Sequence, residues 1–444
     1  LNGRLPFKDV FIHAMVQDGH GQKMSKSLGN GVDPRDIIFS HGADAMRFTL
    51  VQMTTDTQDV RMPVEMVCPH SGVSFEPEFV RTQAGHLVAA PIQVSPQDDS
   101  KQMVSAYGAA SGVAEPDKQT PLARNTSSKF DLGRNFANKL WNATRFALNR
   151  IDEGLVKDID LANRPFIDKW IFARLDETVQ KLEESMDKYQ FNIFADTLYD
   201  FVWHDVCDRY LEAVKPSIDS DPEQQMVLAN LLNAVLRIMH PVCPFVTEAL
   251  WPHVRQATSS TVGGVELPDK EILATASWPK IEITQSLSAS LINDFNSADQ
   301  LVSLIRSTRA EQKVKPKQTI ELYAPDPVLD LLERVNGYVQ ILAGIGEVKP
   351  LLEAPSNGST VITFEGAEIR ISGLNSDIDL NAQKVRLEKL IVDKEKQISG
   401  FKGRLSNEGY LSNAKPEVIE ETRNLLALAE ADLEAAQRSL ANLD

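Results

Sequence analysis

The regular spacing of apolar residues between positions 131 and 239 is the feature that most constrains the fold of this chain of 444 residues. Apolar residues recur at intervals of three and four in four successive stretches, 131–148, Ile167–Tyr189, Asn192–Val214 and Glu223–Met239. This is the period of an α-helix with one buried face. Helices of this length joined by short polar links predict an antiparallel helical bundle, so the fold is expected to be mainly α.

The last 64 residues carry the same spacing twice, with a turn between the two halves. The apolar positions run through Leu387–Leu405 and again through Ile419–Leu440, and Ser406–Pro416 supplies the Gly, Asn and Pro of a turn and a helix start. This pattern predicts an antiparallel coiled-coil hairpin.

The two expected helices of this hairpin differ in charge. The first, from Asn381 to Leu405, has seven Lys or Arg and three Asp or Glu, whereas the second, from Pro416 to Leu440, has two and six. One interpretation is ion pairing between the helices. The other is that the basic residues lie along an RNA backbone, where phosphate contacts give affinity without sequence information. The candidate RNA-binding residues are Lys384, Arg386, Lys389, Lys396, Lys402 and Arg404.

Two segments precede the hairpin. Residues 256–286 are rich in Ser, Thr and Gly and are expected to form a connector. Residues 287–378 alternate helical and strand patterns, which predicts a small α+β module. Five basic residues of this module are expected to form an edge that either contacts RNA phosphates or is simply solvated: Arg306, Arg309, Lys313, Lys315 and Lys317.

A loop near the start of the chain, Gly21–Asn30, has the composition of a phosphate clamp, with two lysines, two hydroxyls and flanking glycines. A solvated basic surface loop is the alternative. Before the loop, Phe7–Val16 is rich in β-formers and predicts a buried strand. After it, Asp33 and Pro34 predict a helix start with Asp33 as the N-cap, and an amphipathic helix is expected from Ala43.

The run KMSKSLGNGVDPRDIIFSHGADAMRFTL, which begins at Lys23, resembles the signature loop of class I aminoacyl-tRNA synthetases and the helices after it. The resemblance implies that the loop closes on ATP during amino-acid activation, with Lys26 and Lys23 as catalytic residues. An ammonium group positioned on the leaving pyrophosphate stabilises the transition state more than the ground state. The residues implied to contact ATP are Lys23, Met24, Ser25, Lys26 and Ser27.

Three further runs resemble the anticodon-binding helical domain of the same family: GRNFANKLWNATRF, LYDFVWHDVCDRYLEAVKP and HPVCPFVTEALW. The first two are most similar to the valine-specific members, and the terminal hairpin resembles the tRNA-binding arm of those members. Trp141, Arg145, Trp203 and His204 lie in these runs. They are interpreted as packing residues, because aromatic residues at helical spacing are more often core than base-stacking platforms.

The resemblance implies a ligase that joins valine to tRNA(Val) through a valyl-adenylate, using ATP and Mg²⁺, and that works as a cytoplasmic monomer. No HIGH motif occurs in the sequence. We therefore expect the chain to be the C-terminal portion of such an enzyme, without its HIGH-containing catalytic half and its editing domain, which binds tRNA but does not catalyse the reaction alone. The alternative is a stand-alone, non-catalytic tRNA-binding protein.

The expected domains follow this order: the end of the catalytic domain with the KMSKS loop and stem-contact helices at 1–65, an insertion at 66–129, the helical anticodon-binding domain at 130–255, the connector at 256–286, the α+β module at 287–378 and the coiled-coil tRNA-binding arm at 379–444. The insertion is rich in Pro, Gly, Ser and Gln and has no persistent period. It is expected to be loop-rich or partly disordered, with a β-hairpin around Ser71–Ala90.

Composition restricts the other possibilities. The net charge of −16 repels polyanions at long range, so RNA binding would have to rely on local basic stripes. The three cysteines are far apart in the sequence, so no structural metal and no disulfide framework are predicted. No apolar run approaches the roughly 20 residues that a membrane helix needs, and no membrane partner is expected.

Overall fold

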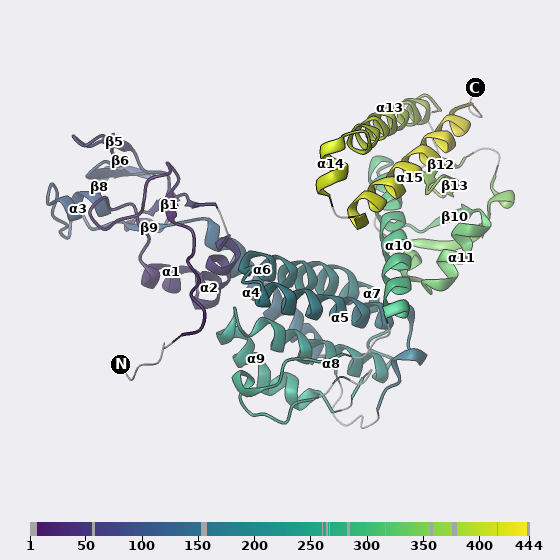
Figure 1. Cartoon of the computed structure of the whole chain (residues 1–444), viewed down its shortest axis with the longest axis horizontal. Helices are drawn as coiled ribbons and strands as arrows, with labels where there is room; N and C mark the ends of the chain where they lie inside the picture. Colours follow the sequence, from purple (N-terminus) through teal and green to yellow (C-terminus); the bar gives the residue numbers. More distant parts are fainter. Residues whose placement is uncertain are drawn as a thin grey trace. The chain divides into compact units, whose positions relative to one another are not determined.

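The computed structural model describes residues 7–441 except 56–57, 152–157, 260, 263–264, 266, 282–284, 316, 356–357, 375–379 and 415. The described residues form two compact units (Figure 1). The first unit holds residues up to 164 together with 171–284, and the second holds 165–170 and the residues from 285 onward. The domain boundaries predicted from the sequence stay predictions.

The first unit begins with two parallel strands that are separated in the chain by two helices. The strand β1 (Val16–Asp18) pairs with β2 (Val60–Met62), and α1 (Pro34–His41) and α2 (Ala43–Met53) lie between them in the sequence. Both helices start where the sequence predicts. The side chain of Asp33 accepts a hydrogen bond of 2.8 Å from the Arg35 backbone N–H, which confirms the predicted N-cap.

The buried strand predicted for Phe7–Val16 is wrong, because only Val16 lies in a strand. Val10 and Ile12 are 81% and 86% exposed. A run of β-formers becomes a buried strand only where another layer covers it, and the described residues provide no such layer here.

Residues 65–126 form a small β-structure that we call the β-subdomain. One sheet has the order β4-β3-β9, and two hairpins, β5-β6 and β7-β8, accompany it. Met66, Cys68, Met103 and Ala123 make a buried core within this subdomain. The elements are β3 (Glu65–Val67), β4 (Ser74–Phe75), β5 (Phe79–Arg81), β6 (Leu87–Ala89), β7 (Ile92–Ser95), β8 (Asp98–Val104), α3 (Ala106–Ser111) and β9 (Arg124–Thr126).

The hairpin β5-β6 falls where the sequence predicts a hairpin, around Ser71–Ala90. The rest of the segment differs from the expectation, because strands and a short helix occupy the stretch expected to be loop-rich. Its strands are mostly three or four residues long. Such short strands leave no periodic pattern that could be recognised in the sequence.

Helices make up most of the rest of the first unit, except that residues 166–170 at the start of α5 belong to the second unit. The helix α4 packs against α8, α9 and the π-helix η2, and every residue of α8 from Gln224 to Met239 is buried. The helices are α4 (Lys129–Leu148), α5 (Phe166–Asp187), α6 (Phe191–Tyr199), η2 (Asp200–Tyr210), α7 (Leu211–Val214), α8 (Pro222–Met239) and α9 (Pro244–Ala257), with short 3₁₀ turns at η1 (Leu161–Asn163) and η3 (Leu273–Thr275).

The predicted helix Asn192–Val214 is continuous in the structure, but its middle eleven residues form the π-helix η2. Asp205 of η2 is 3% exposed. Its carboxylate accepts hydrogen bonds of 3.0 Å from Arg174 Nε and 2.7 Å from Arg209 Nη1. A buried carboxylate is tolerated where it is paired in this way.

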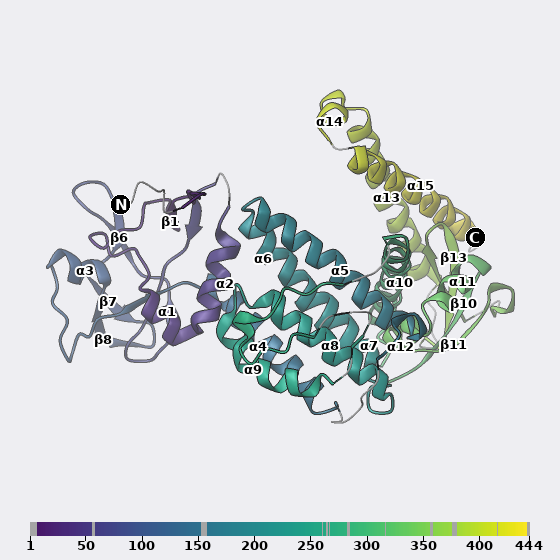
Figure 2. The ribbon, with the colours of Figure 1, turned by 60° about the horizontal axis from the view of Figure 1, so that its bottom comes forward.

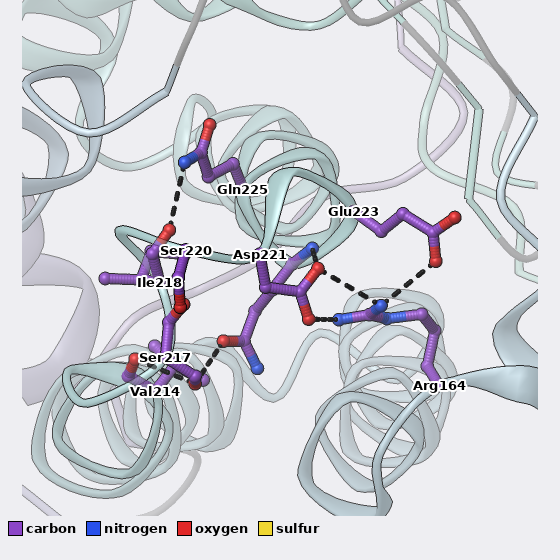
Figure 3. Close-up of polar contacts among 9 residues, drawn as sticks. Arg164, Val214, Ser217, Ile218, Ser220, Asp221, Glu223 and Gln225 are labelled. Carbon is purple, nitrogen blue, oxygen red and sulfur yellow. Dashed lines mark hydrogen bonds and ion pairs between the residues drawn. The ribbon is translucent and has the colours of Figure 1, made fainter.

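An ion-pair cluster fixes the start of α8 (Figure 3). Arg164 is 7% exposed and contacts Asp221 at 2.6 Å and Glu223 at 3.1 Å. Asp221 is also the N-cap of α8, accepting from the Gln224 N–H at 3.0 Å. Burial alone would raise the pKa of Asp221, but the hydrogen bonds from Arg164 and the helix N–H groups lower it below its usual value.

A close joint connects α2 to the helical bundle. Gly133 of α4 lies so near α2 that a Cβ atom there would be 2.5 Å from the carbonyl oxygen of Ala45. Asp44 of α2 is 8% exposed, and its carboxylate accepts from the backbone N–H groups of Phe245 at 3.0 Å and Val246 at 2.6 Å. These N–H groups belong to the first turn of α9, so Asp44 caps a helix of the bundle from outside it.

The second unit contains a four-stranded sheet with the order β11-β10-β13-β12, in which β10 and β11 are parallel and the other pairs are antiparallel. Trp170 stacks on Phe295 of α10 with ring centroids 3.6 Å apart. The elements are α10 (Gln285–Glu311), β10 (Ile320–Ala324), α11 (Asp326–Arg334), α12 (Tyr338–Ala343), β11 (Ile345–Pro350), the 3₁₀ turn η4 (Leu351–Glu353), β12 (Thr360–Phe364) and β13 (Ala367–Ser372).

The C-terminal hairpin is present as predicted. Figure 2 shows α13 (Leu380–Leu405) and α15 (Pro416–Ala441) side by side, with α14 (Glu408–Asn413) at the end where the chain turns back. The helix α15 packs against β12 and β13. Together with the bundle, the hairpin confirms the mainly α fold. None of the helices in the described part of the chain is both long enough and apolar enough to cross a membrane.

We expect Gly133→Ala to lower the free energy of unfolding of the first unit by about 1–3 kcal/mol. The added methyl group would overlap the Ala45 backbone, and this outweighs the gain of about 1 kcal/mol in helix propensity. Four of the five tryptophans, all except Trp170, belong to the first unit, so urea unfolding followed by tryptophan fluorescence measures the effect. The control is Asn135→Ala on the exposed side of the same helix, expected to change stability by less than about 0.5 kcal/mol. Equal midpoints for Gly133→Ala and the wild type would contradict the close joint.

Candidate functional site

The KMSKS loop (Gly21–Asn30) follows shortly after the end of β1, and its base is organised by the carboxylate of Asp18. Asp18 is 4% exposed. It accepts hydrogen bonds from the backbone N–H groups of His20 at 3.0 Å and Gln22 at 2.9 Å, from Gln22 Nε2 at 3.0 Å and from Asn30 Nδ2 at 2.8 Å. Burial alone would raise the pKa of this carboxyl, but the four hydrogen bonds together lower it.

Asn30 closes the loop from its other end. Its Oδ1 accepts from the Ser25 N–H at 2.9 Å, and its Nδ2 also reaches the carbonyl oxygen of Lys23 at 3.3 Å. Within the loop, the Leu28 N–H donates to Ser25 Oγ at 3.2 Å and the Gly29 N–H donates to the Lys26 carbonyl at 3.2 Å. The chain from Lys23 to Gly29 is therefore a compact turn and not an extended excursion.

The five residues predicted to contact ATP have different surroundings. Lys23, Lys26 and Ser27 are exposed. Among the described residues, neither lysine forms an ion pair within 4.0 Å. Met24 is half-buried and packs against the apolar cluster of Ile37, Met62 and Phe130. Ser25 Oγ lies 3.2 Å from Ser27 Oγ. The loop thus presents two ammonium groups and the Ser27 hydroxyl to solvent. Met24 holds the loop on its inner side, against the apolar cluster.

Two contacts of the loop come from the β-subdomain. The side-chain amide of Gln22 exchanges two hydrogen bonds with the backbone of Leu87 in β6, and Asn125 of β9 donates to the carbonyl oxygens of Gly29 and Gly31. The sequence analysis missed both residues. No local signal could have found Asn125, because it lies 96 positions from Gly29.

A cavity of about 540 Å³ lies between the loop base and the β-subdomain. Asp18, Asn30, Glu65, Glu76 and Asn125 contribute polar groups to its wall, and neither Lys23 nor Lys26 lines it. The described residues contain no group of three or more His, Cys, Asp or Glu side chains arranged to hold a metal ion.

The predicted RNA-binding residues of the hairpin separate into distinct groups. Lys389, Lys396 and Arg404 are exposed, and no ion pair is found for them among the described residues. Lys402 is exposed but pairs with Glu430 of α15 at 2.7 Å, so for this residue pairing between the helices is observed. Lys384 is half-buried, and the side chain of Arg386 lies outside the described residues.

Lys394 was not among the predicted RNA-binding residues, and in the structure it helps to hold the hairpin together. Its Nζ donates to Asp432 Oδ2 at 2.6 Å, and the same carboxylate accepts from the Gly366 N–H at 2.8 Å. This pair ties both helices of the hairpin to the turn between β12 and β13.

The predicted basic edge of the second unit is partly structural. Arg309 is 8% exposed and donates to the carbonyl oxygens of Gln318 at 2.7 Å and Lys315 at 3.3 Å. Arg306 donates to the carbonyl oxygen of Leu342 at 2.8 Å. Arg309 is thus buried against backbone oxygens, whereas Arg306 is exposed and, like the three lysines of this set, stays a candidate for RNA phosphates.

The four residues interpreted as packing residues, Trp141, Arg145, Trp203 and His204, have different surroundings in the structure. Trp203 stacks on Tyr199 with ring centroids 5.2 Å apart, and the ammonium group of Lys139 lies 4.2 Å from its ring centroid. Trp141 is 45% exposed, and Arg145 and His204 are exposed as well. Exposed aromatic and basic side chains on a bundle surface are suited to contact a partner.

Three family models match separate parts of the chain. The model described as "tRNA synthetases class I (I, L, M and V)" matches residues 1–63, and the "Anticodon-binding domain of tRNA ligase" matches residues 168–324. The "Valyl tRNA synthetase tRNA binding arm" matches residues 379–444. Their order is the order expected from the sequence.

Curated relatives align with nearly the whole chain. A valine--tRNA ligase of Rhodopirellula baltica is 34% identical over 457 residues, which cover 99% of this chain and 42% of the relative. A valine--tRNA ligase of Thermotoga maritima is 30% identical, with 95% of this chain and 40% of the relative covered. The chain thus spans less than half the length of these relatives. A leucine enzyme structure from Agrobacterium radiobacter, a ternary complex of LeuRS with tRNA and LeuAMS, covers 72% of this chain and 26% of its own at 17% identity and a TM-score of 0.36.

We expect Asp18→Asn to lower the free energy of unfolding of the first unit at about pH 7 by about 1–3 kcal/mol, because an amide cannot accept all four N–H donors. The folded carboxyl has the lowered pKa, so its stabilisation is complete above the unfolded value of 3.8 and is lost as the pH falls through the folded value. The stability difference between wild type and variant, measured by urea unfolding, should therefore shrink toward about pH 3. Asp99→Asn, an exposed carboxylate, serves as the control. A difference independent of pH would rule out this role of Asp18.

Proposed function

The chain belongs to the valine--tRNA ligase family of class I enzymes, and from this premise we propose that its bundle and hairpin bind tRNA(Val) while its KMSKS loop serves the ATP-dependent activation of valine. The observation that carries the proposal is the loop itself. Two exposed ammonium groups stand on a turn whose base is fixed by hydrogen bonds that Asp18 accepts from Asn30 and that Asn30 accepts from the Ser25 N–H. The resemblance extends the proposal to a monomeric, cytoplasmic enzyme.

The proposed chemistry needs positive charge where the loop offers it. The valine carboxylate attacks the α-phosphorus of ATP, the bond to the bridging oxygen breaks, and the electron pair leaves with pyrophosphate. Charge therefore builds on the leaving phosphate oxygens, where a positioned ammonium group stabilises it. Lys26 and Lys23 are proposed to supply this charge, with Lys26 as the main contributor, and Ser25 and Ser27 to hold the turn and contact the phosphates.

Mg²⁺ is proposed to arrive with ATP. The loop offers ammonium and hydroxyl groups and no carboxylate, whereas Mg²⁺ prefers oxygen anions. The donor set therefore fits a Mg²⁺ ion that is carried by the phosphates and not by the loop. The HIGH motif does not occur in this sequence, so the proposed reaction requires the remaining parts of a ligase.

The tRNA-binding proposal rests on the hairpin. Lys389 and Lys396 are seven residues apart on α13 and hence on the same face, and Arg404 lies near its end. Exposed cations at this spacing suit the phosphates of an RNA backbone. A stand-alone, non-catalytic tRNA-binding protein is the second candidate. The exposed cations of the hairpin favour it equally, but it does not explain the KMSKS loop.

We expect the combined variant Lys389→Ala, Lys396→Ala and Arg404→Ala to bind tRNA(Val) more weakly, with affinity reduced by about 10-fold or more at moderate salt. Each lost phosphate contact should also lower the slope of log affinity against log salt by about one. Fluorescence anisotropy of labelled tRNA over a salt series measures both quantities. Arg423→Ala is the control, since this exposed cation of α15 is paired with Glu420 at 3.2 Å. An unchanged slope would exclude these residues from the contact.

In a full ligase that contains this chain, we expect Lys26→Ala to lower valine-dependent ATP–pyrophosphate exchange by about 10²–10³-fold, as for the loss of one positioned transition-state donor. Lys118→Ala is the control, because it removes an exposed ammonium group outside the loop. Wild-type exchange by the Lys26→Ala enzyme would remove this lysine from the chemistry. Exchange kinetics at varied ATP distinguish lost binding from lost turnover.

A further inference from the structure

The β-subdomain contacts the KMSKS loop immediately before its first lysine. The Nε2 of Gln22 donates to the Leu87 carbonyl at 2.7 Å, and the Leu87 N–H donates to the Oε1 of Gln22 at 2.9 Å. The amide of Gln22 thus pairs with β6 as a neighbouring strand would. His20 adds an edge-to-face contact with Phe79 of β5, with ring centroids 4.6 Å apart.

The β-subdomain also holds the other end of the loop. Asn125 is 8% exposed, and its Nδ2 donates to the Gly29 carbonyl at 2.8 Å and to the Gly31 carbonyl at 2.7 Å. Gly29 has a φ of +58°, and a Cβ atom there would lie 2.2 Å from the backbone nitrogen of Tyr107. Only glycine allows the loop to approach α3 this closely.

We propose that the β-subdomain is a brace for the KMSKS loop, and that Gln22 and Asn125 are positioning residues for Lys23 and Lys26. This rests on the proposed function of the loop in ATP chemistry. No family model covers the β-subdomain, since the matched ranges are 1–63, 168–324 and 379–444. Its contacts with the loop give this segment a function.

The brace acts because it fixes the two ends and leaves the middle exposed. Gln22 and Gly29 are held by half-buried hydrogen bonds, and the lysines between them face solvent. A shorter free segment has fewer conformations, so the ammonium groups sample a smaller volume. For a transition-state contact, a displacement of about 1 Å can cost on the order of 10²-fold in rate.

Limited proteolysis of the 444-residue chain tests the brace without any ligase activity. Trypsin cleaves after Lys23 and Lys26 once the loop opens, and cleavage after Lys118, an exposed site of the β-subdomain, provides the internal reference. The variants are Gln22→Ala and Asn125→Ala, with Gln83→Ala, an exposed amide in the β5-β6 turn, as the matched control. Mass spectrometry follows each cleavage over time.

We expect cleavage after Lys26, relative to Lys118, to be about 5- to 30-fold faster in both variants, because each loses two hydrogen bonds between loop and brace. Gln83→Ala should match the wild type. If Asn125→Ala unfolds the β-subdomain, cleavage after Lys118 also becomes faster and no longer serves as the reference. Gln22→Ala then provides the test, because Gln22 belongs to the loop and not to the β-subdomain. A wild-type rate after Lys26 in Gln22→Ala overturns the proposal.

A second measurement ties the brace to catalysis. In a full ligase, Asn125→Ala should lower kcat for ATP–pyrophosphate exchange by about 10-fold and leave the KM for valine unchanged, since the loop is displaced and the valine pocket is not. If the ligase function itself is wrong, no exchange is seen with the wild type, while the proteolysis result stands. Exchange at the wild-type kcat would show that the brace holds the loop without serving catalysis.

Discussion

The close joint between α2 and α4 is the constraint on which the first unit depends. Gly133 lets the two helices meet backbone to backbone, and Asp44 of α2 caps the N-terminus of α9 across the same joint. The second helix after the KMSKS loop is therefore packed directly into the bundle. A segment proposed to act on ATP and a bundle proposed to bind tRNA thus share one buried surface, and a change at that surface affects both.

The sequence predicted the helices well where apolar residues repeat over several turns. The starts at Pro34 and Ala43, the bundle helices and the C-terminal hairpin all appear where their spacing placed them. The π-helical geometry of Asp200–Tyr210 was missed, because the same residues fit an α-helix and the buried Asp205 gives no local signal. The exposed run before Val16 was misread for a similar reason, since burial depends on a second layer that periodicity does not reveal.

The candidate site shows the same division. The motif placed the lysines and hydroxyls on one loop, and their neighbours Asp18 and Asn30 lie close enough in the chain to belong to the same turn. Asn125 is far from the loop in the chain, and the short strands of the β-subdomain place it beside the loop. On the hairpin, composition identified the basic helix but could not tell Lys402, which pairs with Glu430, from Lys396, for which no ion pair is found among the described residues. Only the facing residues separate the two cases.

The contacts of Asp432 fix the hairpin to the sheet at one point along its length. One carboxylate joins Lys394 of α13 to the Gly366 N–H of the sheet, and α15 lies on β12 and β13 near the same point. From Lys394 to the end of α13 the helix spans about 16 Å, so a tilt of about 10° at this point moves that end by roughly 3 Å. A small repacking at the sheet is thereby transmitted to the end of the hairpin as a displacement of about half a helical turn.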